Sequence, residues 1–335
     1  MNIYEFICEY LEKGKGGVLA TVIKRAGSAP RDVGAKMFVG EDGKTFGTVG
    51  GGRLEAESYR SALEIMNKGL VKTFGISMEA QSVKEKDMLC GGNVEILLEP
   101  VTIEHLNVYK QIEYCLKNRM RGAVVTKFSG NVFTKTLIDK DLNTTGDALD
   151  TETITQCKNI IHEKQAILMD GVFIDPIRLS FPLYIFGAGH VAQFLSKIAK
   201  IADFHITVID DRKEFANTER FPDADAIIVG DFPDAVNYLD FTGNEYVVIL
   251  TRGHEYDAVV LGESIKRPAK YVGMIGSRRK VKIILDNMRE GGLDENTIGR
   301  IHAPIGIPIN AETPEEIAIS IAAELVSVRN AKETD

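Results

Sequence analysis

A glycine-rich turn in the second half of the chain has the residue types and spacing of a phosphate-binding site. Residues 187–192, GAGHVA, follow the apolar run 183–186 and precede a helical pattern of apolar residues. Gly187 permits a sharp turn, and Gly189 lets the backbone approach a ligand while the amides at the start of the helix face an anion. The pattern favours phosphate binding; the alternative is that the two glycines only pack the helix against the strand.

Two acidic residues extend this pattern. A second apolar run, 205–209, ends in Asp210 and Asp211, about 20 residues after Gly187. At that spacing an acid can bind a ribose hydroxyl, so strand, turn, helix and acid together indicate a dinucleotide-binding fold. Arg212 follows the acids directly, which leaves both NAD and NADP open as ligands. The fold alone does not name the ligand, because it serves many functions.

A second glycine cluster lies in the first half of the chain. Gly50, Gly51 and Gly52 stand between a strand pattern, 45–49, and an amphipathic helix pattern that extends to Leu70. Three consecutive glycines cost backbone entropy and bring no side chains. We therefore expect their amides and the helix N-terminus to close on an anionic ligand. The alternative is a flexible connection, which rarely joins a regular strand to a helix.

A basic loop precedes these glycines. Arg25, Arg31 and Lys36 lie within one short stretch that also contains glycine and proline, in a chain that is acidic as a whole. Such a loop suits an anionic ligand; a solvated surface loop is the alternative.

The four cysteines, at positions 8, 90, 115 and 157, are too far apart for a Cys-x-x-Cys pair. Their spacing therefore supports neither a zinc ribbon nor a disulfide framework. Cys90 stands beside Gly91 and Gly92 at the entrance to a strand pattern, which makes it the preferred thiol for a functional role. The alternative for a free cysteine is a small buried apolar residue.

After the GAGHVA turn, strand and helix patterns alternate in the order of a doubly wound α/β domain. The strand patterns 226–229, 245–250 and 271–275 are each followed by a helical pattern. Ligands bind at the carboxyl ends of such strands, and arginine binds phosphate through paired hydrogen bonds. The candidate ligand contacts at these ends are Gly187, Gly189, His190, Asp210, Asp211, His254, Ser277, Arg278 and Arg279. For the two histidines, a structural or surface role is the alternative.

The composition is that of a soluble globular protein with room for two domains: 335 residues, 44% hydrophobic and 26% charged. A net charge of −8 argues against a broad surface for nucleic acid or anionic membranes. No apolar run reaches the length of a membrane span, and the first residues lack the pattern of a signal peptide. We therefore expect a cytoplasmic protein that binds neither nucleic acid nor membrane.

The predicted fold is α/β, with an N-terminal α+β domain followed by a Rossmann-like doubly wound domain. We place these domains at residues 1–178 and 179–335. A polar stretch, 141–155, shows no catalytic pattern. The elements predicted in the first domain are helices over 3–11 and 103–117, strands over 18–23, 93–99, 122–128, 132–138 and 172–177, and a hairpin turn at Asp42 and Gly43.

Eight motifs distributed along the chain point to one known family. The first half contains GSAPRDVGAKM, GTVGGGRLEAE and CGGNVEILLEP; the second contains LYIFGAGHVA, VIDDR, TRGHEYD, YVGMIGSRRK and PIGIPINAETPEEIAISIAAEL. These motifs resemble those of the xanthine dehydrogenase accessory factor family (XdhC/CoxI). The resemblance covers nearly the whole chain apart from the middle section and the termini, and its motifs are long enough to be specific.

The resemblance implies a maturation factor that need not turn over a substrate. Members of the family bind molybdenum cofactor, help to protect it during sulfuration, and aid its insertion into molybdenum hydroxylases similar to xanthine dehydrogenase. The implied partners are the client hydroxylase and a cysteine desulfurase, and we expect a homodimer. The ligand contacts implied by motif are Ser28, Arg31, Lys36, Gly50, Gly51, Gly52, Glu55, Cys90 and the adjacent Gly91.

Two positions depart from the family pattern. Arg53 stands where relatives often have cysteine or histidine after the three glycines, and Arg252 replaces a histidine in the frequent Thr-His-x-His motif. Thiol or imidazole chemistry is therefore absent at these two positions. Arg53 becomes a candidate for phosphate binding instead.

A rival interpretation is an NAD(P)-dependent oxidoreductase. In this interpretation the GAGHVA turn and Asp210 hold the dinucleotide, and His254 serves as acid or base. It leaves the GGG and CGG loops without a role, and the sequence offers no convincing catalytic pair for hydride transfer. In a third interpretation, the dinucleotide fold regulates the chaperone and both ligands bind.

Overall fold

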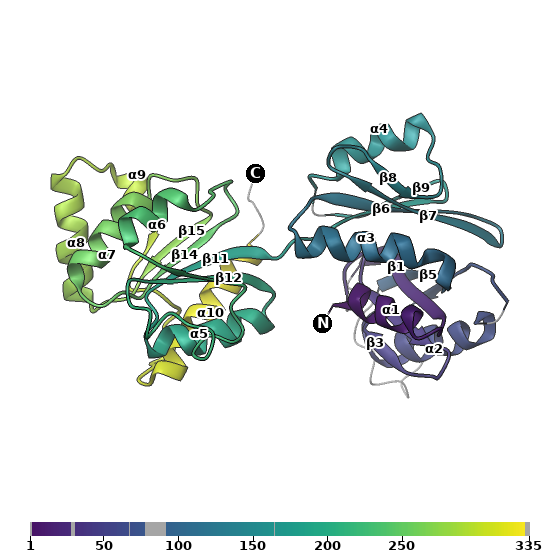
Figure 1. Ribbon diagram of the computed structural model, residues 1–335, viewed down its shortest axis with the longest axis horizontal. Coiled ribbons are helices and arrows are strands. Elements are labelled where there is room, and N and C mark those ends of the chain that lie inside the picture. The colour runs from purple at the N-terminus through teal and green to yellow at the C-terminus, as the bar shows by residue number, and fades with distance from the viewer. Residues whose placement is uncertain (1, 28–30, 67, 78–91, 164, 332–335) are drawn as a thin grey trace. The chain divides into compact units, whose positions relative to one another are not determined.

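The computed structural model describes residues 2–27, 31–66, 68–77, 92–163 and 165–331. The chain divides into two compact units, Met1–Leu179 and Ser180–Asp335, called unit 1 and unit 2 below (Figure 1). Within the described ranges, no helix has both the length and the apolar character needed to cross a membrane.

Unit 1 contains two five-stranded antiparallel sheets. Sheet A has the order β3-β2-β1-β5-β4, and sheet B has the order β8-β7-β6-β10-β9. The strands of sheet A are β1 (Gly17–Gly27), β2 (Lys36–Gly40), β3 (Thr45–Gly47), β4 (Lys72–Ser77) and β5 (Gly92–Val101). Those of sheet B are β6 (Gly122–Ser129), β7 (Val132–Asp139), β8 (Thr144–Gly146), β9 (Ile167–Met169) and β10 (Val172–Pro176).

Both faces of sheet A are buried, and its central strand β1 shows why. Val18, Ala20 and Val22 pack with the buried face of helix α2 (Gly52–Ile65), whereas Leu19 joins a cluster on the opposite face. Alternate residues of a strand point to opposite faces, so a strand that is apolar at successive positions must be covered on both sides.

The second face of sheet A and the inner face of sheet B share one apolar core. Phe38 of β2 and Leu137 of β7 belong to the same cluster as buried residues of α1 (Ile3–Glu12) and α3 (Leu106–Lys117), which a short 3-10 turn, Ile103–His105, precedes. Helix α4 (Thr151–Ile160) covers the outer face of sheet B. The layers α4, sheet B, α3, sheet A and α2 follow one another through unit 1 (Figure 1).

A buried ion pair links the two sheets of unit 1. Lys135 of β7 lies 2.6 Å from Glu99 of β5, and these side chains are 4% and 1% exposed. Lys135 also donates to the Thr126 hydroxyl at 2.9 Å, and Tyr109 donates to Glu99 at 3.2 Å. Hydrogen bonds therefore accompany the ion pair, as burial of charge requires.

Unit 2 is built on a six-stranded sheet of order β13-β12-β11-β14-β15-β16 in which all neighbours are parallel. The strands are β11 (Phe181–Phe186), β12 (Phe204–Asp210), β13 (Ala226–Val229), β14 (Tyr246–Ile249), β15 (Tyr271–Met274) and β16 (Ile301–His302). The helices are α5 (His190–Ile201), α6 (Phe232–Tyr238), α7 (His254–Ser264), α8 (Arg278–Glu290), α9 (Glu295–Ile298) and α10 (Pro314–Asn330).

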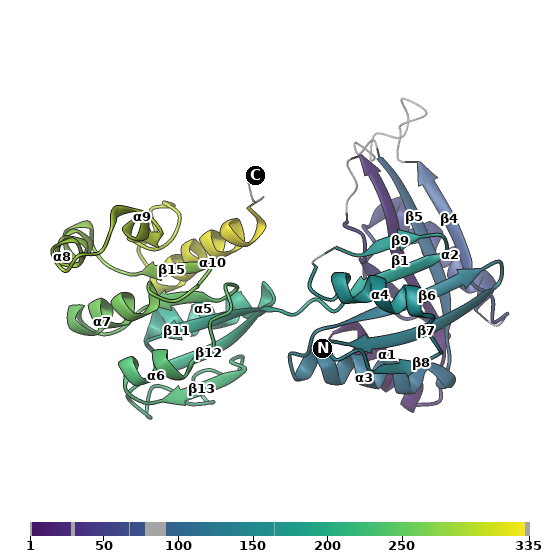
Figure 2. The same ribbon diagram turned by 90° about the horizontal axis from the view of Figure 1, so that it is seen from above.

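Helices cover both faces of this sheet, as a doubly wound domain requires. One buried cluster joins the sheet to α5 and α10, and a second joins it to α6, α7 and α8 (Figure 2). The strand order reverses at β11, which has β12 on one side and β14 on the other. Such a reversal is where ligands of open α/β sheets bind. The predicted α/β fold, with a Rossmann-like domain after an α+β domain, is confirmed.

Candidate functional site

The two glycines of the GAGHVA turn have different roles in unit 2. Gly187 has a φ of +105°, and a Cβ there would lie 2.3 Å from the Leu250 carbonyl oxygen, so only glycine fits. A Cβ at Gly189 would meet no described atom within 4 Å. Gly189 precedes α5, whose first residue, His190, is exposed. Close packing thus requires the first glycine, while the second leaves the backbone at the start of α5 approachable.

Asp210 is enclosed at the end of β12. It is 1% exposed, and its carboxylate accepts hydrogen bonds from the Ala188 amide at 2.8 Å and the Arg212 amide at 3.0 Å. The Arg212 guanidinium donates to both carboxylate oxygens, at 2.8 and 3.0 Å. Burial raises the pKa of Asp210, but these hydrogen bonds outweigh burial and hold its pKa below the usual value. Asp210 is therefore an ionised group that fixes the glycine turn.

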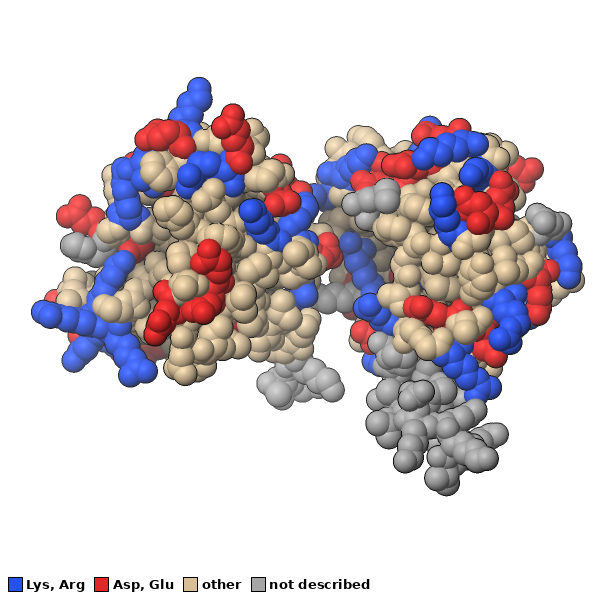
Figure 3. Space-filling model, turned by 90° about the horizontal axis from the view of Figure 1, so that it is seen from below, with Lys and Arg blue, Asp and Glu red and all other residues tan. Residues whose placement is uncertain are grey.

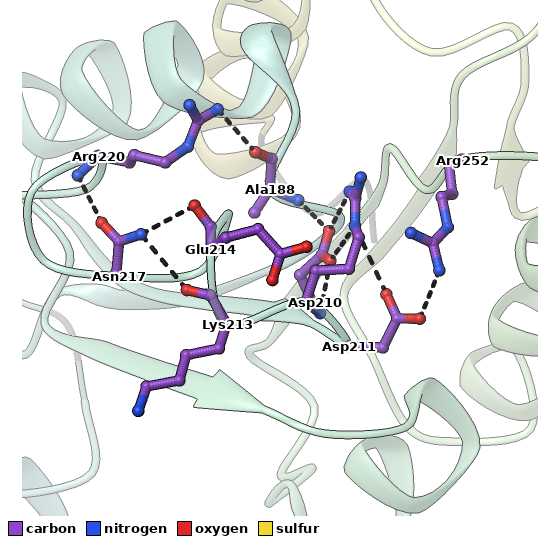
Figure 4. Close-up of polar contacts among 9 residues, drawn as sticks. Ala188, Asp210, Asp211, Lys213, Glu214, Asn217, Arg220 and Arg252 are labelled. Atoms are coloured by element: carbon purple, nitrogen blue, oxygen red, sulfur yellow. Dashed lines mark hydrogen bonds and ion pairs between the residues drawn. The ribbon is translucent and has the colours of Figure 1, made fainter.

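Asp211 is also bound by arginine. Arg252, which follows β14, donates to Asp211 at 2.7 Å, and Arg212 Nε lies 3.7 Å from the other carboxylate oxygen. Figure 4 shows Asp211 beside the guanidinium group of Arg252. Arg252, which departs from the family pattern, thus links the ends of β12 and β14.

The loop after β12 folds back onto the glycine turn. Asn217 accepts from the Arg220 amide at 3.1 Å and donates to the carbonyls of Lys213 and Glu214 at 3.3 and 3.0 Å. Arg220 then reaches the Ala188 carbonyl at 3.3 Å (Figure 4). The peptide groups of Ala188 are therefore held on both sides, its amide by Asp210 and its carbonyl by Arg220.

The starts of α7 and α8 are joined through Asp257, which is fully buried. Thr251 donates to it at 2.6 Å, and Lys280 of α8 forms an ion pair with it. His254 begins α7. Ser277 caps α8 by accepting from the Lys280 amide at 3.3 Å.

Exposed cations mark the first turn of α8. Arg278 and Arg279, the first two residues of the helix, are both exposed. Lys and Arg side chains gather at the end of unit 2 where Figure 1 places α8 (Figure 3). The first turn of α8 therefore offers a positive surface to an anion.

The GGG turn of unit 1 is shaped by its glycines. Gly50, Gly51 and Gly52 have φ values of +136°, +76° and +55°, which side chains would disfavour. The Gly51 amide donates to Glu55 at 3.0 Å, and Glu55 also accepts from the Thr48 hydroxyl. Glu55, a predicted ligand contact, thus serves the turn itself.

Part of the GGG turn remains approachable. A Cβ at Gly51 or Gly52 would meet no described atom within 4 Å. Helix α2 begins at Gly52, and the amides of a first helical turn have no partner within the helix. Arg53 is exposed beside them. The turn therefore combines open backbone with a cation.

The remaining candidates of unit 1 are not all brought together. Arg31 is exposed. The Lys36 ammonium donates to the Gly34 carbonyl at 3.0 Å and pairs with Asp175 of sheet B. Lys36 thus points away from the face that α2 covers. The candidates Ser28, Cys90 and Gly91 lie outside the described residues.

The sequence did not reveal which side chain pairs with Lys36 or which one holds the Ala188 carbonyl of the glycine turn. Asp175, which pairs with Lys36, lies far away in the sequence, and Arg220 has no local motif. Only Arg212, directly after Asp210 and Asp211, gave a signal that could have revealed its role. Within the residues that the structure describes, no group of three or more His, Cys, Asp or Glu side chains could hold a metal ion.

Two protein-family models match the sequence of this chain. The "XdhC and CoxI family" model matches residues 10–75, which include the GGG turn, and the "XdhC Rossmann domain" model matches residues 183–325. The chain belongs to the XdhC and CoxI family. The resemblance expected from its motifs is therefore confirmed.

Relatives of this XdhC/CoxI chain extend along its whole length. It is 25% identical to a Bacillus subtilis protein named as a probable subunit of xanthine dehydrogenase, over 98% of both chains. It is 27% identical to the "molybdenum cofactor insertion chaperone PaoD" of Escherichia coli, over 100% of this chain and 90% of that one. It is also 27% identical to E. coli YqeB over 331 residues, and it spans 47% of the length of that protein.

A solved structure shares the fold of this XdhC/CoxI chain. The crystal structure of a protein described as a xanthine dehydrogenase from Bacillus halodurans aligns with a TM-score of 0.81 and 27% identity. The alignment covers 99% of this chain and 97% of that one.

Proposed function

We propose that this chain is a maturation factor that binds molybdenum cofactor and assists its insertion into a molybdenum hydroxylase similar to xanthine dehydrogenase. The similarity to a molybdenum cofactor insertion chaperone over the whole chain carries the proposal. The Bacillus subtilis relative, whose name refers to xanthine dehydrogenase, agrees with a client of that class.

The GGG turn supports this function because its residues fit the phosphate of such a cofactor. The open space beside Gly51 and Gly52, the amides at the start of α2 and the exposed Arg53 suit an anionic group. Arg53 and these amides would hold the phosphate, with the exposed Arg31 as a further candidate. When bound, the cofactor supplies the molybdenum centre that the client hydroxylase requires.

The first experiment is a binding assay with the whole chain. The protein is mixed anaerobically with freshly released molybdenum cofactor and gel-filtered, and the protein peak is assayed for molybdenum and oxidised-pterin fluorescence. We expect metal and pterin to co-elute with the protein. Absence of both from the peak would remove the basis of the proposal.

A pair of arginine variants tests the assignment of the site. Arg53→Ala is expected to weaken the binding of the molybdenum cofactor about tenfold or more, since a charge-assisted hydrogen bond contributes about 1.5–3 kcal/mol. Arg60→Ala is the matched control, because Arg60 is an exposed arginine of the same helix that pairs with Glu57. Equal retention by both variants and the native protein would exclude Arg53 as a contact.

Finer parts of this function are also proposed. The chain helps to protect the cofactor during sulfuration, has a cysteine desulfurase as a second partner, and acts as a homodimer in the cytoplasm. Light scattering tests the dimer, and mixing experiments with a cysteine desulfurase test the second partner. The rival oxidoreductase function depends on NAD(P), and binding of NADH and NADPH is measured in parallel.

A further inference from the structure

Asp210 occupies the position at which Rossmann domains bind ribose, yet the bonding capacity of its carboxylate is already used. Its two oxygens accept four hydrogen bonds, from the Ala188 amide and from the amide and guanidinium of Arg212. The residue is 1% exposed. Ribose hydroxyls need this carboxylate as their acceptor. A ribose could therefore bind here only after the Arg212 side chain had moved away.

Arg212 is itself held in place by packing. Its guanidinium carbon lies 3.8 Å from the centre of the Phe215 ring, and that of Arg220 lies 4.9 Å from the same ring centre. Arg220 also donates to Ala188 at 3.3 Å and to Gln193 at 3.2 Å. The residues that close Asp210 thus belong to one packed cluster with the glycine turn.

The neighbouring acid, Asp211, is also paired with arginine. Asp211 accepts a hydrogen bond from Arg252 at 2.7 Å and lies 3.7 Å from Arg212 Nε. Both acids at the end of β12 are therefore neutralised by arginine.

Exchange of Arg212 for a ribose is unfavourable. Asp210 would lose its counter-ion and the two hydrogen bonds from the guanidinium, and two neutral hydroxyls would replace them. Hydrogen bonds from the hydroxyls to the carboxylate are also charge-assisted, but a neutral sugar brings no positive charge to the buried carboxylate, so it restores only part of the loss.

We propose that Arg212 determines the ligand specificity of unit 2: by closing the ribose position, it makes unit 2 reject adenine dinucleotides although unit 2 carries their fingerprint. The inference concerns unit 2 alone and does not depend on the proposed molybdenum cofactor function. It sets this Rossmann domain apart from the oxidoreductases that share its glycine turn.

The test is a calorimetric titration of the full-length protein with ADP-ribose, the part of NAD that contacts the turn and the acid. 2′-Phospho-ADP-ribose, the corresponding part of NADP, is titrated in parallel. The variants are Arg212→Ala and Arg212→Gln; the glutamine variant retains one donor for the buried carboxylate and so limits any loss of stability. Arg289→Ala is the matched control, because Arg289 is an exposed arginine of α8 that pairs with Asp286 and Glu295.

We expect no saturable binding of either probe to the native protein or to Arg289→Ala at millimolar concentration. Both Arg212 variants are expected to bind ADP-ribose with a Kd about 10- to 100-fold below millimolar, because hydrogen bonds to a freed carboxylate contribute that factor. Near-ultraviolet circular dichroism confirms that each variant is folded.

Two results would overturn the proposal. Micromolar binding of either probe to the native protein would mean that Arg212 does not close the position. Unchanged affinity in a folded Arg212→Gln protein would mean that another feature excludes the ribose.

Discussion

Three cysteine side chains lie in the apolar interior of unit 1. Cys8, Cys115 and Cys157 are 4%, 0% and 0% exposed. Burial raises the pKa of Cys8 to about 12, with a contribution from Glu113, and raises the pKa of Cys157 to about 11. Burial also raises the pKa of Cys115. The protonated thiol is therefore the dominant form at neutral pH, and it is a poor nucleophile.

These three thiols are expected to resist alkylation in the native protein at pH 7.5. Iodoacetamide treatment followed by peptide mass spectrometry should leave Cys8, Cys115 and Cys157 unmodified, while unfolding in urea makes all three reactive. Because the raised pKa values keep the three thiols protonated, raising the pH to 9 should not make them react with iodoacetamide. Native modification of Cys157 at the rate of a free thiol would contradict its burial.

At the scale of single residues, the sequence predicted where a candidate residue lies in the fold better than which side chains it contacts. The GAGHVA turn and Asp210 could be found because the turn, the strand end and their spacing are local features. The use of Asp210 could not be found, because it depends on how Phe215 and Arg220 direct the Arg212 side chain. Lys36 was expected to contact an anionic ligand, and the structure gives it Asp175 of the other sheet as a partner.

At the scale of elements, hydrophobic periodicity predicted many of the longer strands and helices, but not strand β4 or helix α10. Strand β13 has the predicted bounds, 226–229, and the hairpin of β6 and β7 lies within a residue of its predicted position. Strands β8 and β16 were missed because they have three and two residues, too few for a periodic pattern. The first half of helix α4 lies in the polar stretch 141–155, where apolar positions are few.

The Lys135–Glu99 ion pair allows a test of how strands β5 and β7, from the two sheets of unit 1, are held together. Lys135→Met leaves Glu99 buried without a counter-ion between the sheets, and should lower the free energy of unfolding by about 3–5 kcal/mol. The double variant Glu99→Leu, Lys135→Met should recover most of this loss, because apolar side chains then replace both charges. Urea unfolding monitored by hydrogen exchange of peptides from β5 and β7 measures the change.

The matched control is Lys110→Met, which removes an exposed lysine of α3 that pairs with Glu12. Exposed pairs contribute little, so this variant should unfold as the native protein does. A double variant as unstable as Lys135→Met alone would show that packing, not charge, governs this region.

At the scale of the whole molecule, the two units should respond separately to damage in their cores. Phe186 is fully buried beneath α6 and α7 in unit 2, so Phe186→Ala should destabilise unit 2 by about 3–5 kcal/mol. Amide hydrogen exchange should rise throughout unit 2 and stay at the native level in unit 1. Phe38→Ala, in the core of unit 1, is the reciprocal variant. Equal loss of protection in both units after either change would contradict separate cores.

The buried clusters have a consequence for inheritance. Among the described residues, every apolar cluster draws its members from one unit, and none crosses the boundary between Leu179 and Ser180. A genetic exchange at this boundary would leave each core intact. Chimeras that join unit 1 of one family member to unit 2 of another should therefore fold, and each half should retain the ligand preference of its parent. Ancestral genes could have exchanged the two halves without disrupting either core.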